Sequence, residues 1–209
     1  MIVSMSSMLI VGGMGYLGAA LGSFVGAQVW RLRARQLRED AANGERVSKS
    51  EVARLRGLIR PVLADRSECL HCHHELQWYD LLPIISWLTL RGRCRYCHKP
   101  IGATEILVEV GLAATFIVSY LSWPLGTSTA FGVVSLVLWL MSCVLMAILF
   151  VYDAKWFLLP LSINVALIVT ALVFAILRIS VEGADMSTVV SALAAVGLMA
   201  GLYLSLIHI

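Results

Sequence analysis

The sequence predicts an all-α polytopic membrane protein of about five transmembrane helices, with a small cytoplasmic insert of zinc-ribbon type. Of its 209 residues, 59% are hydrophobic and only 14% are charged, whereas soluble domains are close to half apolar. The apolar residues form long uncharged runs, and four cysteines in two CxxC pairs lie in the most highly charged part of the chain. The composition therefore excludes an ordinary soluble domain, and the cysteine pairs indicate a metal site outside the bilayer.

The uncharged runs define the expected membrane spans, because a spanning helix needs about 20 apolar residues. The second uncharged run, residues 110–152, is long enough for two spans, and its residues 122–129 supply Pro, Gly and Ser for a turn between them. The first run lacks the basic residues that precede a secretory signal peptide, so we expect it to remain as a helix. The five expected spans cover residues 8–30, 105–122, 130–152, 156–178 and 187–207.

The distribution of basic residues predicts the orientation. All of the 16 Lys and Arg except Lys155 and Arg178 lie between residues 31 and 99. Basic residues next to a span stay in the cytoplasm, so the N-terminus is expected outside and the cysteine-rich segment inside. The net charge of +3 therefore reflects membrane topology, and the sequence carries no motif for binding nucleic acid.

The cytoplasmic segment contains two local signals. Ser48 and Glu51 have the spacing of a capping box, which predicts the start of a short amphipathic helix. Between the CxxC pairs, residues 78–90 are apolar and aromatic, and Trp78 is typical of a membrane interface. That stretch is either the insert's own core or a surface resting at the bilayer, and Asp80 is expected to cap a helix within it.

The two CxxC pairs predict a structural zinc site with a complete tetrahedral shell. The expected ligands are Cys69, Cys72, Cys94 and Cys97. Disulfides or a redox pair are the alternatives, and they are disfavoured in a cytoplasmic loop. His73 and His98 follow the two pairs where many knuckles have Gly, and His enters the left-handed region more readily than most residues.

Three acidic residues near span ends are candidate functional groups. Asp153 lies between two apolar runs, where its alternatives are an ordinary interfacial acid or a partner of Lys155. Glu105 and Glu109 are four residues apart, so they share one helix face and are candidates for contacting a basic substrate segment. The GxxxGxxxG pattern of residues 18–26 predicts close packing of the first helix on a neighbour.

Three segments resemble those of type IV prepilin peptidases. Residues 21–33 read LGSFVGAQVWRLR, which is similar to the end of the family's first span. Residues 67–110 match the family's long cysteine-rich block, and residues 151–160, VYDAKWFLLP, match its D.....LP motif. The resemblance runs from about residue 22 to residue 160, and the cysteine-rich block is specific to the family.

This resemblance implies an aspartic endopeptidase of the bacterial inner membrane. Such enzymes remove the basic leader from prepilins and pseudopilins at the cytoplasmic face, and they serve type IV pili and type II secretion. Many also N-methylate the new terminus with S-adenosylmethionine, an activity tied to the segment that contains Gly22. Asp153 matches the first of the family's two catalytic aspartates, and Glu109 matches a family Glu.

The family's second aspartate lies in a GxGD motif that this sequence does not contain, since residues 182–186 read EGADM. We therefore expect a C-terminally truncated form that is inactive alone, with last residues that are not native. The expected organisation is a first transmembrane helix (1–30), a cytoplasmic segment with the four-cysteine zinc-binding motif (31–103) and an incomplete peptidase core (104–209). A non-catalytic zinc-ribbon scaffold and a membrane thiol oxidoreductase are the competing functions.

Overall fold

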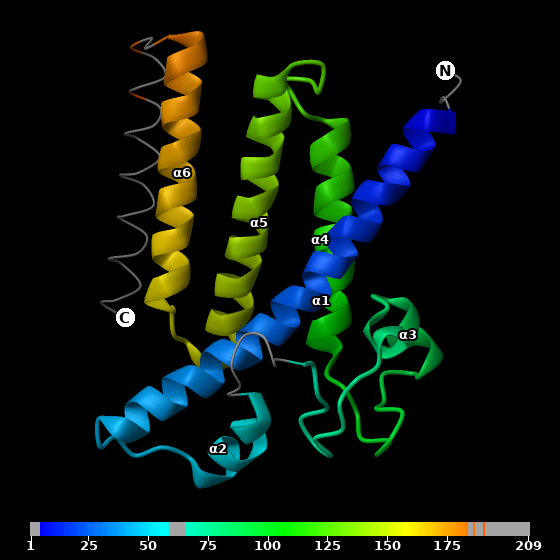
Figure 1. Cartoon of the computed structure of the whole chain (residues 1–209), viewed down its shortest axis with the longest axis vertical. Coiled ribbons are helices and arrows are strands. Elements are labelled where there is room, and N and C mark those ends of the chain that lie inside the picture. The colour runs from blue at the N-terminus through cyan, green and yellow to red at the C-terminus, as the bar shows by residue number, and fades with distance from the viewer. Residues whose placement is uncertain (1–4, 59–65, 184–185, 187–189, 191–209) are drawn as a thin grey trace.

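The structure is a computed structural model that describes residues 5–58, 66–183, 186 and 190. Within these residues the chain is helical, and pairing of extended backbone is confined to two isolated bridges. Its α-helices are α1 (Met5–Ala42), α2 (Lys49–Leu55), α3 (Ile85–Thr89), α4 (Ala103–Leu121), α5 (Ala130–Trp156) and α6 (Leu161–Glu182). Short 3-10 helices form η1 (Arg56–Leu58) and η3 (Trp78–Leu81). The predicted all-α class is confirmed (Figure 1).

Four helices among the described residues are long and apolar enough to cross a membrane. They cover Ser7–Ala42, Ala103–Leu121, Ala130–Trp156 and Leu161–Val181. These helices correspond to the first four expected spans, and the fifth, at residues 187–207, lies outside the described residues except for residue 190. The predicted polytopic membrane architecture is therefore confirmed for the described part of the chain.

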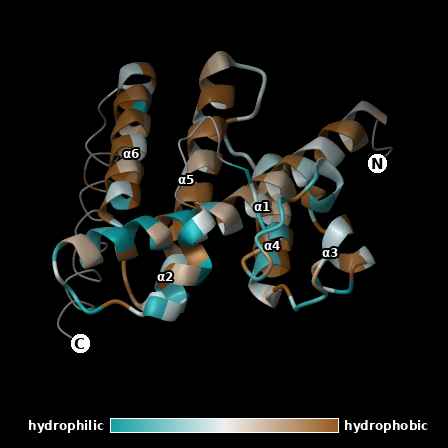
Figure 2. Cartoon of the chain, turned by 60° about the horizontal axis from the view of Figure 1, so that its bottom comes forward, coloured by the Kyte–Doolittle hydropathy of each residue, from teal (hydrophilic) through white to brown (hydrophobic). Residues whose placement is uncertain are grey.

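The first helix is longer than the sequence predicted, because α1 continues to Ala42 instead of ending near residue 30. Residues 31–42 contain Arg, Leu, Ala and Gln but neither Gly nor Pro, so nothing stops the helix before Gly44, which has φ +80°. This extension is largely hydrophilic, whereas α2 carries both hydrophilic and hydrophobic residues (Figure 2). The division of the chain at residue 30 stays a prediction, and α1 runs through that point as one helix.

The small residues of α1 let it approach α4 closely. A Cβ atom added at Gly18 would lie 2.6 Å from the backbone oxygen of Leu112. One added at Gly22 would lie 2.5 Å from the Cα atom of Glu109. Both distances are shorter than van der Waals contact, so the predicted close packing of the GxxxG face is confirmed at these two positions.

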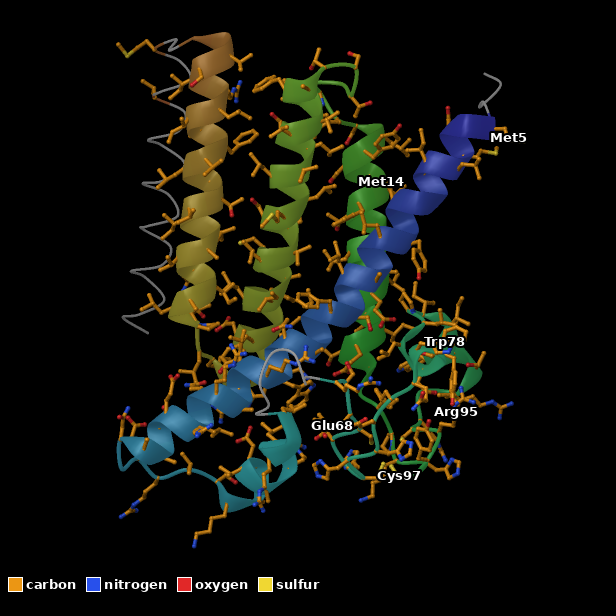
Figure 3. The ribbon with its side chains drawn as sticks, viewed as in Figure 1. Met5, Met14, Glu68, Trp78, Arg95 and Cys97 are labelled. Atoms are coloured by element: carbon orange, nitrogen blue, oxygen red, sulfur yellow. The ribbon has the colours of Figure 1, made fainter. Side chains whose placement is uncertain are left out.

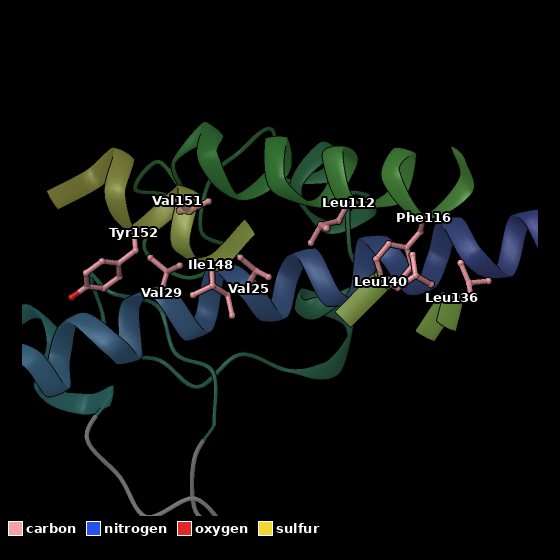
Figure 4. Close-up of a cluster of buried hydrophobic side chains, with 9 residues drawn as sticks. All are labelled: Val25, Val29, Leu112, Phe116, Leu136, Leu140, Ile148, Val151 and Tyr152. Atoms are coloured by element: carbon pink, nitrogen blue, oxygen red, sulfur yellow. The ribbon is translucent and has the colours of Figure 1, made fainter. Parts of the chain in front are cut away.

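A buried apolar cluster joins α1, α4 and α5 (Figure 4). Its members are Val25, Val29, Leu112, Phe116, Leu136, Leu140, Ile148, Val151 and Tyr152. A second cluster of Ala34, Leu37 and Leu55 packs α2 against the extension of α1. The amide of Glu51 donates to Ser48 Oγ at 3.4 Å, which confirms the predicted helix start at Ser48. These contacts place α2 beside the end of the bundle where α4 begins and α5 ends, which we call the insert end.

Candidate functional site

The cysteine-rich insert (residues 66–102) brings the four predicted metal ligands together. Ligand atoms of Cys69, Cys72, Cys94 and Cys97 all lie within 4.8 Å of one another. Each pair forms the same backbone turn, in which the amide of the first Cys donates to a carbonyl five residues later, at 3.0 Å and 2.9 Å. Two equivalent turns thus present four sulfur atoms to one point, which is the donor set that a tetrahedral zinc site uses.

The two histidines have the backbone role that the sequence indicated. His73 has φ 57° and His98 has φ 56°, and their amides donate to the carbonyls of Cys69 and Cys94 at 2.9 and 3.0 Å. The Nδ1 atom of His73 is hydrogen-bonded to Glu68 at 2.9 Å. Among the described residues, the cluster able to hold a metal ion is made of the cysteines, without either imidazole.

Two of the four thiols have shifted pKa values without a metal ion. Burial raises the pKa of Cys69 to about 12, so the metal-free thiol stays protonated at neutral pH. The backbone amide of Lys99 lowers the pKa of Cys97, which favours the thiolate there. A bound zinc ion would deprotonate the ligands and hold the two turns together, and four ligands leave it no open position for catalysis.

Asp80 connects the middle of the insert to the second knuckle. The Gln77 amide donates to Asp80 Oδ2 at 3.2 Å, so Asp80 closes a capping box from inside η3, whereas the N-cap residues of η3 and α3 are Gln77 and Ile84. Arg95 Nε donates to Oδ1 at 2.7 Å and the Tyr96 hydroxyl donates to Oδ2 at 3.1 Å. Burial opposes ionisation, but the bond from Arg95 and those from Gln77 and Tyr96 outweigh it and lower the pKa of Asp80. The carboxylate therefore has a structural role that exceeds a helix cap.

A cavity of about 360 Å³ lies between the insert, α1 and the start of α4. Gly22, Ser23 and Gly26 of α1 line one side, and Glu105 and Glu109 of α4 line another. The shared face predicted for the two glutamates is therefore confirmed, and it faces the protein instead of lipid. Glu109 accepts a hydrogen bond from the backbone amide of Ile84 at 2.7 Å. This bond ties α4 directly to the insert.

Three polar atoms in the cavity wall are buried and have no hydrogen-bond partner among the described residues. They are Arg54 Nε, Trp87 Nε1 and Glu105 Oε2. Such atoms are costly to leave unpaired, so their gathering in one cavity points to a polar ligand or ordered water at this place. No local pattern in the sequence indicated Arg54 or Trp87, because the chain folds back from separate segments to bring them here.

The side chain of Lys155 points toward this cavity and not toward Asp153. Its Nζ atom lies 4.0 Å from Glu105 Oε1 and 4.5 Å from the ring centre of Trp30. Trp30 also donates to the same Glu105 oxygen at 3.3 Å. The alternative in which Lys155 neutralises Asp153 is therefore wrong, because the lysine side chain points toward α1 and α4.

Asp153 lies in the last turn of α5 and its side chain is exposed. The helix ends at Trp156, and the amide of Phe157, in the left-handed region with φ 54°, donates to the Asp153 carbonyl at 2.8 Å. No hydrogen bond or ion pair joins its carboxylate to the described residues, and Asp153 is not among the residues that line the cavity. The structure thus gathers the glutamates and the insert at one place and leaves Asp153 accessible beside it.

A second set of contacts, absent from the sequence prediction, fixes this end of α5. Arg33 of α1 forms two 3.0 Å bonds with Glu51 of α2 and lies 5.2 Å from the ring centre of Trp156. The hydroxyl of buried Tyr152 is hydrogen-bonded to Gln36. Because Gln36 and Tyr152 lie 116 positions apart, no local pattern could have identified this contact.

The fold and the insert together define an all-α membrane protein with a four-cysteine insert, able to hold a metal ion, at one end of its helix bundle. Residues 16–123 match the family described as the bacterial peptidase A24 N-terminal domain, and the chain belongs to this family. This result confirms the family resemblance that the three sequence segments indicated.

Curated relatives agree with this assignment. A type 4 prepilin-like proteins leader peptide-processing enzyme of Escherichia coli is 34% identical over 60% of this chain and 44% of its own length. A prepilin leader peptidase/N-methyltransferase of Stutzerimonas stutzeri is 32% identical, with 59% and 42% covered. One with the same name from Pectobacterium carotovorum is 32% identical, with 93% and 63% covered. The chain therefore spans about two fifths to two thirds of these relatives, and no solved structure matches it.

Proposed function

We propose that this chain is part of an integral-membrane aspartic endopeptidase that cleaves leader peptides of type IV prepilins or pseudopilins. Family membership supports the class, and relatives bear the names leader peptidase and leader peptide-processing enzyme. The observation that carries the proposal for this chain is an accessible carboxylate, Asp153, at the insert end of α5. The match of residues 151–160 to the family's D.....LP motif had already indicated Asp153 from the sequence.

The chemistry requires a second carboxylate. Amide hydrolysis by two acids needs one ionised group to accept a proton from water and one protonated group to polarise the amide. Two nearby carboxylates reach this state because their titrations move apart. Asp153 supplies one of the two groups in this proposal, and a single aspartate cannot divide the roles. We therefore expect the 209-residue chain by itself to lack peptidase activity.

The proposed orientation places the insert end in the cytoplasm of a bacterial inner membrane. The extension of α1, α2 and the insert carry the basic residues that stay in the cytoplasm. The leader of a substrate would then approach Asp153 from the cytoplasmic side. A reporter fused after residue 58 in place of the insert, compared with one fused within residues 122–129, would test this orientation.

Substitution of Asp153 in the full-length gene product tests the peptidase proposal. We expect Asp153→Asn to lower leader cleavage by at least about 100-fold, because a catalytic acid–base group contributes this much or more. Asp40→Asn is a matched control, since Asp40 lies on the extension of α1. Retained cleavage in Asp153→Asn protein, or robust cleavage by the 209-residue chain, would contradict the assignment.

Glu105 is the better of the two glutamates for contacting a basic leader residue. Glu109 already accepts the Ile84 amide, whereas Glu105 keeps one oxygen without a partner on the cavity wall. A carboxylate at that position attracts a Lys or Arg side chain of the substrate. We expect Glu105→Gln to raise KM for basic leaders and to leave kcat nearly unchanged. An unchanged KM would remove Glu105 from the substrate site.

We further propose that the cavity holds S-adenosylmethionine, since relatives are named N-methyltransferases. The lining residues fit such a molecule: Arg54 suits its carboxylate, and the rings of Trp30 and Trp87 suit its base. The bound donor would supply the methyl group. Direct binding of S-adenosylmethionine to the purified protein should weaken in Trp87→Phe, which keeps an aromatic side chain but replaces the indole by a phenyl ring and so removes the unpartnered N–H. Equal affinities would exclude this placement.

A further inference from the structure

The insert exposes an apolar surface that its own fold does not use. Its four large side chains are Trp78, Leu81, Ile85 and Leu88, which are 74%, 40%, 57% and 59% exposed, and Leu81 also lines the edge of the cavity. We call these residues of η3 and α3 the α3 patch. Because they remain this exposed, they are not the core of the insert, which was one of the two roles left open for residues 78–90.

The α3 patch lies on the side of the insert that faces the membrane spans. The Ile84 amide, next to α3, donates to Glu109, which is six residues into α4. At 1.5 Å per residue, this contact is about 9 Å along α4 from its first residue. Figure 1 shows α3 beside the lower part of α4, and in Figure 3 Trp78 is nearer the bundle than Cys97 is. The α3 patch therefore reaches the level of a membrane helix while the knuckles project away.

Five backbone amides and the Thr89 hydroxyl of this segment donate hydrogen bonds within the protein, and the unpartnered Trp87 Nε1 lies on the cavity wall. The amides of Ile84, Ile85, Ser86, Leu88 and Leu90 all donate to protein acceptors. The Thr89 hydroxyl donates to the carbonyls of Ile85 and Ser86 at 2.9 and 3.0 Å. Asp80 is held by Arg95 and Tyr96. A segment with its backbone satisfied internally can enter a region without water, whereas one with open amides cannot.

Basic and apolar neighbours continue the surface on its two sides. Arg91 and Arg93 follow α3 directly and are exposed, so they can reach phosphate groups of anionic lipids. On α4, Leu107 and Val110 are also exposed and belong to a helix that crosses the membrane. An apolar patch that adjoins a spanning helix and is followed by arginines has the composition of an interfacial anchor.

We propose that the α3 patch inserts into the lipid leaflet on the insert side and anchors the cysteine-rich insert there. The anchor goes beyond the peptidase and methylation proposals, and it holds whether or not either is correct. Lipid is favoured over a protein partner because the segment that carries the patch is hydrogen-bonded to Glu109 of the apolar helix α4 and is followed by two exposed arginines. The anchor would fix the insert, and thus the cavity, relative to the membrane surface.

Photocrosslinking in native membranes tests this anchor. The full-length protein would carry benzoylphenylalanine in place of Leu88, and a matched variant would carry it in place of Lys99, which is exposed on the second knuckle. We expect lipid adducts, identified by mass spectrometry, at position 88 and not at position 99. Adducts to a prepilin or another protein at position 88, or equal lipid labelling at both positions, would overturn the proposal.

Tryptophan quenching gives an independent measurement that needs no unnatural residue. The contribution of Trp78 to the fluorescence is the difference between the unchanged protein and Trp78→Phe. This difference should be much smaller in bilayers of brominated lipid than in bilayers of ordinary lipid. The ring of Trp87 packs against Gly92, so the fluorescence of Trp87, obtained in the same way from Trp87→Phe, should be quenched less. If the Trp78 contribution is as bright in brominated as in ordinary lipid, the α3 patch faces water and the anchor does not exist.

Discussion

Replacing Gly22 by alanine should separate α1 from α4, and Gly26 provides a control on the same helix face. A Cβ atom at Gly22 would lie 2.5 Å from Glu109 Cα, 2.9 Å from Glu109 N and 3.0 Å from the Val108 carbonyl oxygen. All three are backbone atoms, so no side chain can rotate away to make room. Ordinary carbon contacts are about 3.5–4.0 Å, so the helices must move apart by about 1 Å.

The cost follows from this displacement. Overpacking a well-packed contact costs about 1–3 kcal/mol, which exceeds the gain of up to about 1 kcal/mol from alanine's better helix propensity. At Gly26 the nearest atom is the Glu105 Cγ at 3.7 Å, an ordinary contact with a flexible side chain. Gly26→Ala should therefore be neutral or slightly stabilising, while Gly22→Ala should be destabilised by about 1–2 kcal/mol.

Reversible unfolding in mixed detergent micelles, followed by helical circular dichroism, would measure both free energies of unfolding. If Gly22→Ala and Gly26→Ala unfold at the same detergent composition, the close approach of α1 and α4 is wrong. The result also bears on Gly22 as a methylation residue. A variant that loses methylation with unchanged stability would indicate a direct role in place of packing.

Three further changes test the insert and α2. Purified protein should contain about one zinc ion per chain, and the zinc content should fall in Cys97→Ser and stay the same in Cys143→Ser. Acid should release the zinc because protons compete with it for the thiolates. Equal zinc content in the two variants would refute the site. Asp80→Asn should lower insert stability by about 1–3 kcal/mol, measured by thermal unfolding, whereas exposed Glu45→Gln should have little effect. Ser48→Ala should cost about 1 kcal/mol by removing the cap of α2, seen as faster amide exchange there, and unaltered exchange would argue against the cap.

The described spans and the four-cysteine cluster could be predicted from sequence because both follow from local sequence patterns. An uncharged run of about 20 residues has one stable form in lipid, and CxxC spacing places two sulfurs on one turn whatever surrounds it. The left-handed backbone of His73 and His98 was likewise a local inference. The continuation of α1 beyond residue 30 was not indicated, because loss of hydrophobicity ends a span but does not end a helix. Arg, Leu and Gln after Trp30 are good helix formers, so α1 continued.

The cavity could not be predicted, because its lining comes from segments far apart in the chain. Trp30 and Glu105 are 75 residues apart, and nothing local to either indicates the bond between them. From the sequence, Asp153 is the acidic residue nearest to Lys155, two positions away, and an ion pair between them was one alternative. Residues two apart on a helix point to different sides, which the pairing of Lys155 with Glu105 confirms.

This separation has a consequence for how the two proposed activities relate. The side chain of Lys155 contacts Glu105 and Trp30. Asp153, on the same turn of α5, is exposed and is not among the residues that line the cavity. We infer that peptide cleavage and methyl transfer, if both occur, use different sides of the end of α5. A cleaved substrate would then have to shift its new terminus from one side to the other. Lys155→Ala should therefore impair binding in the cavity more than cleavage at Asp153, and equal losses in the two assays would show that they share one surface.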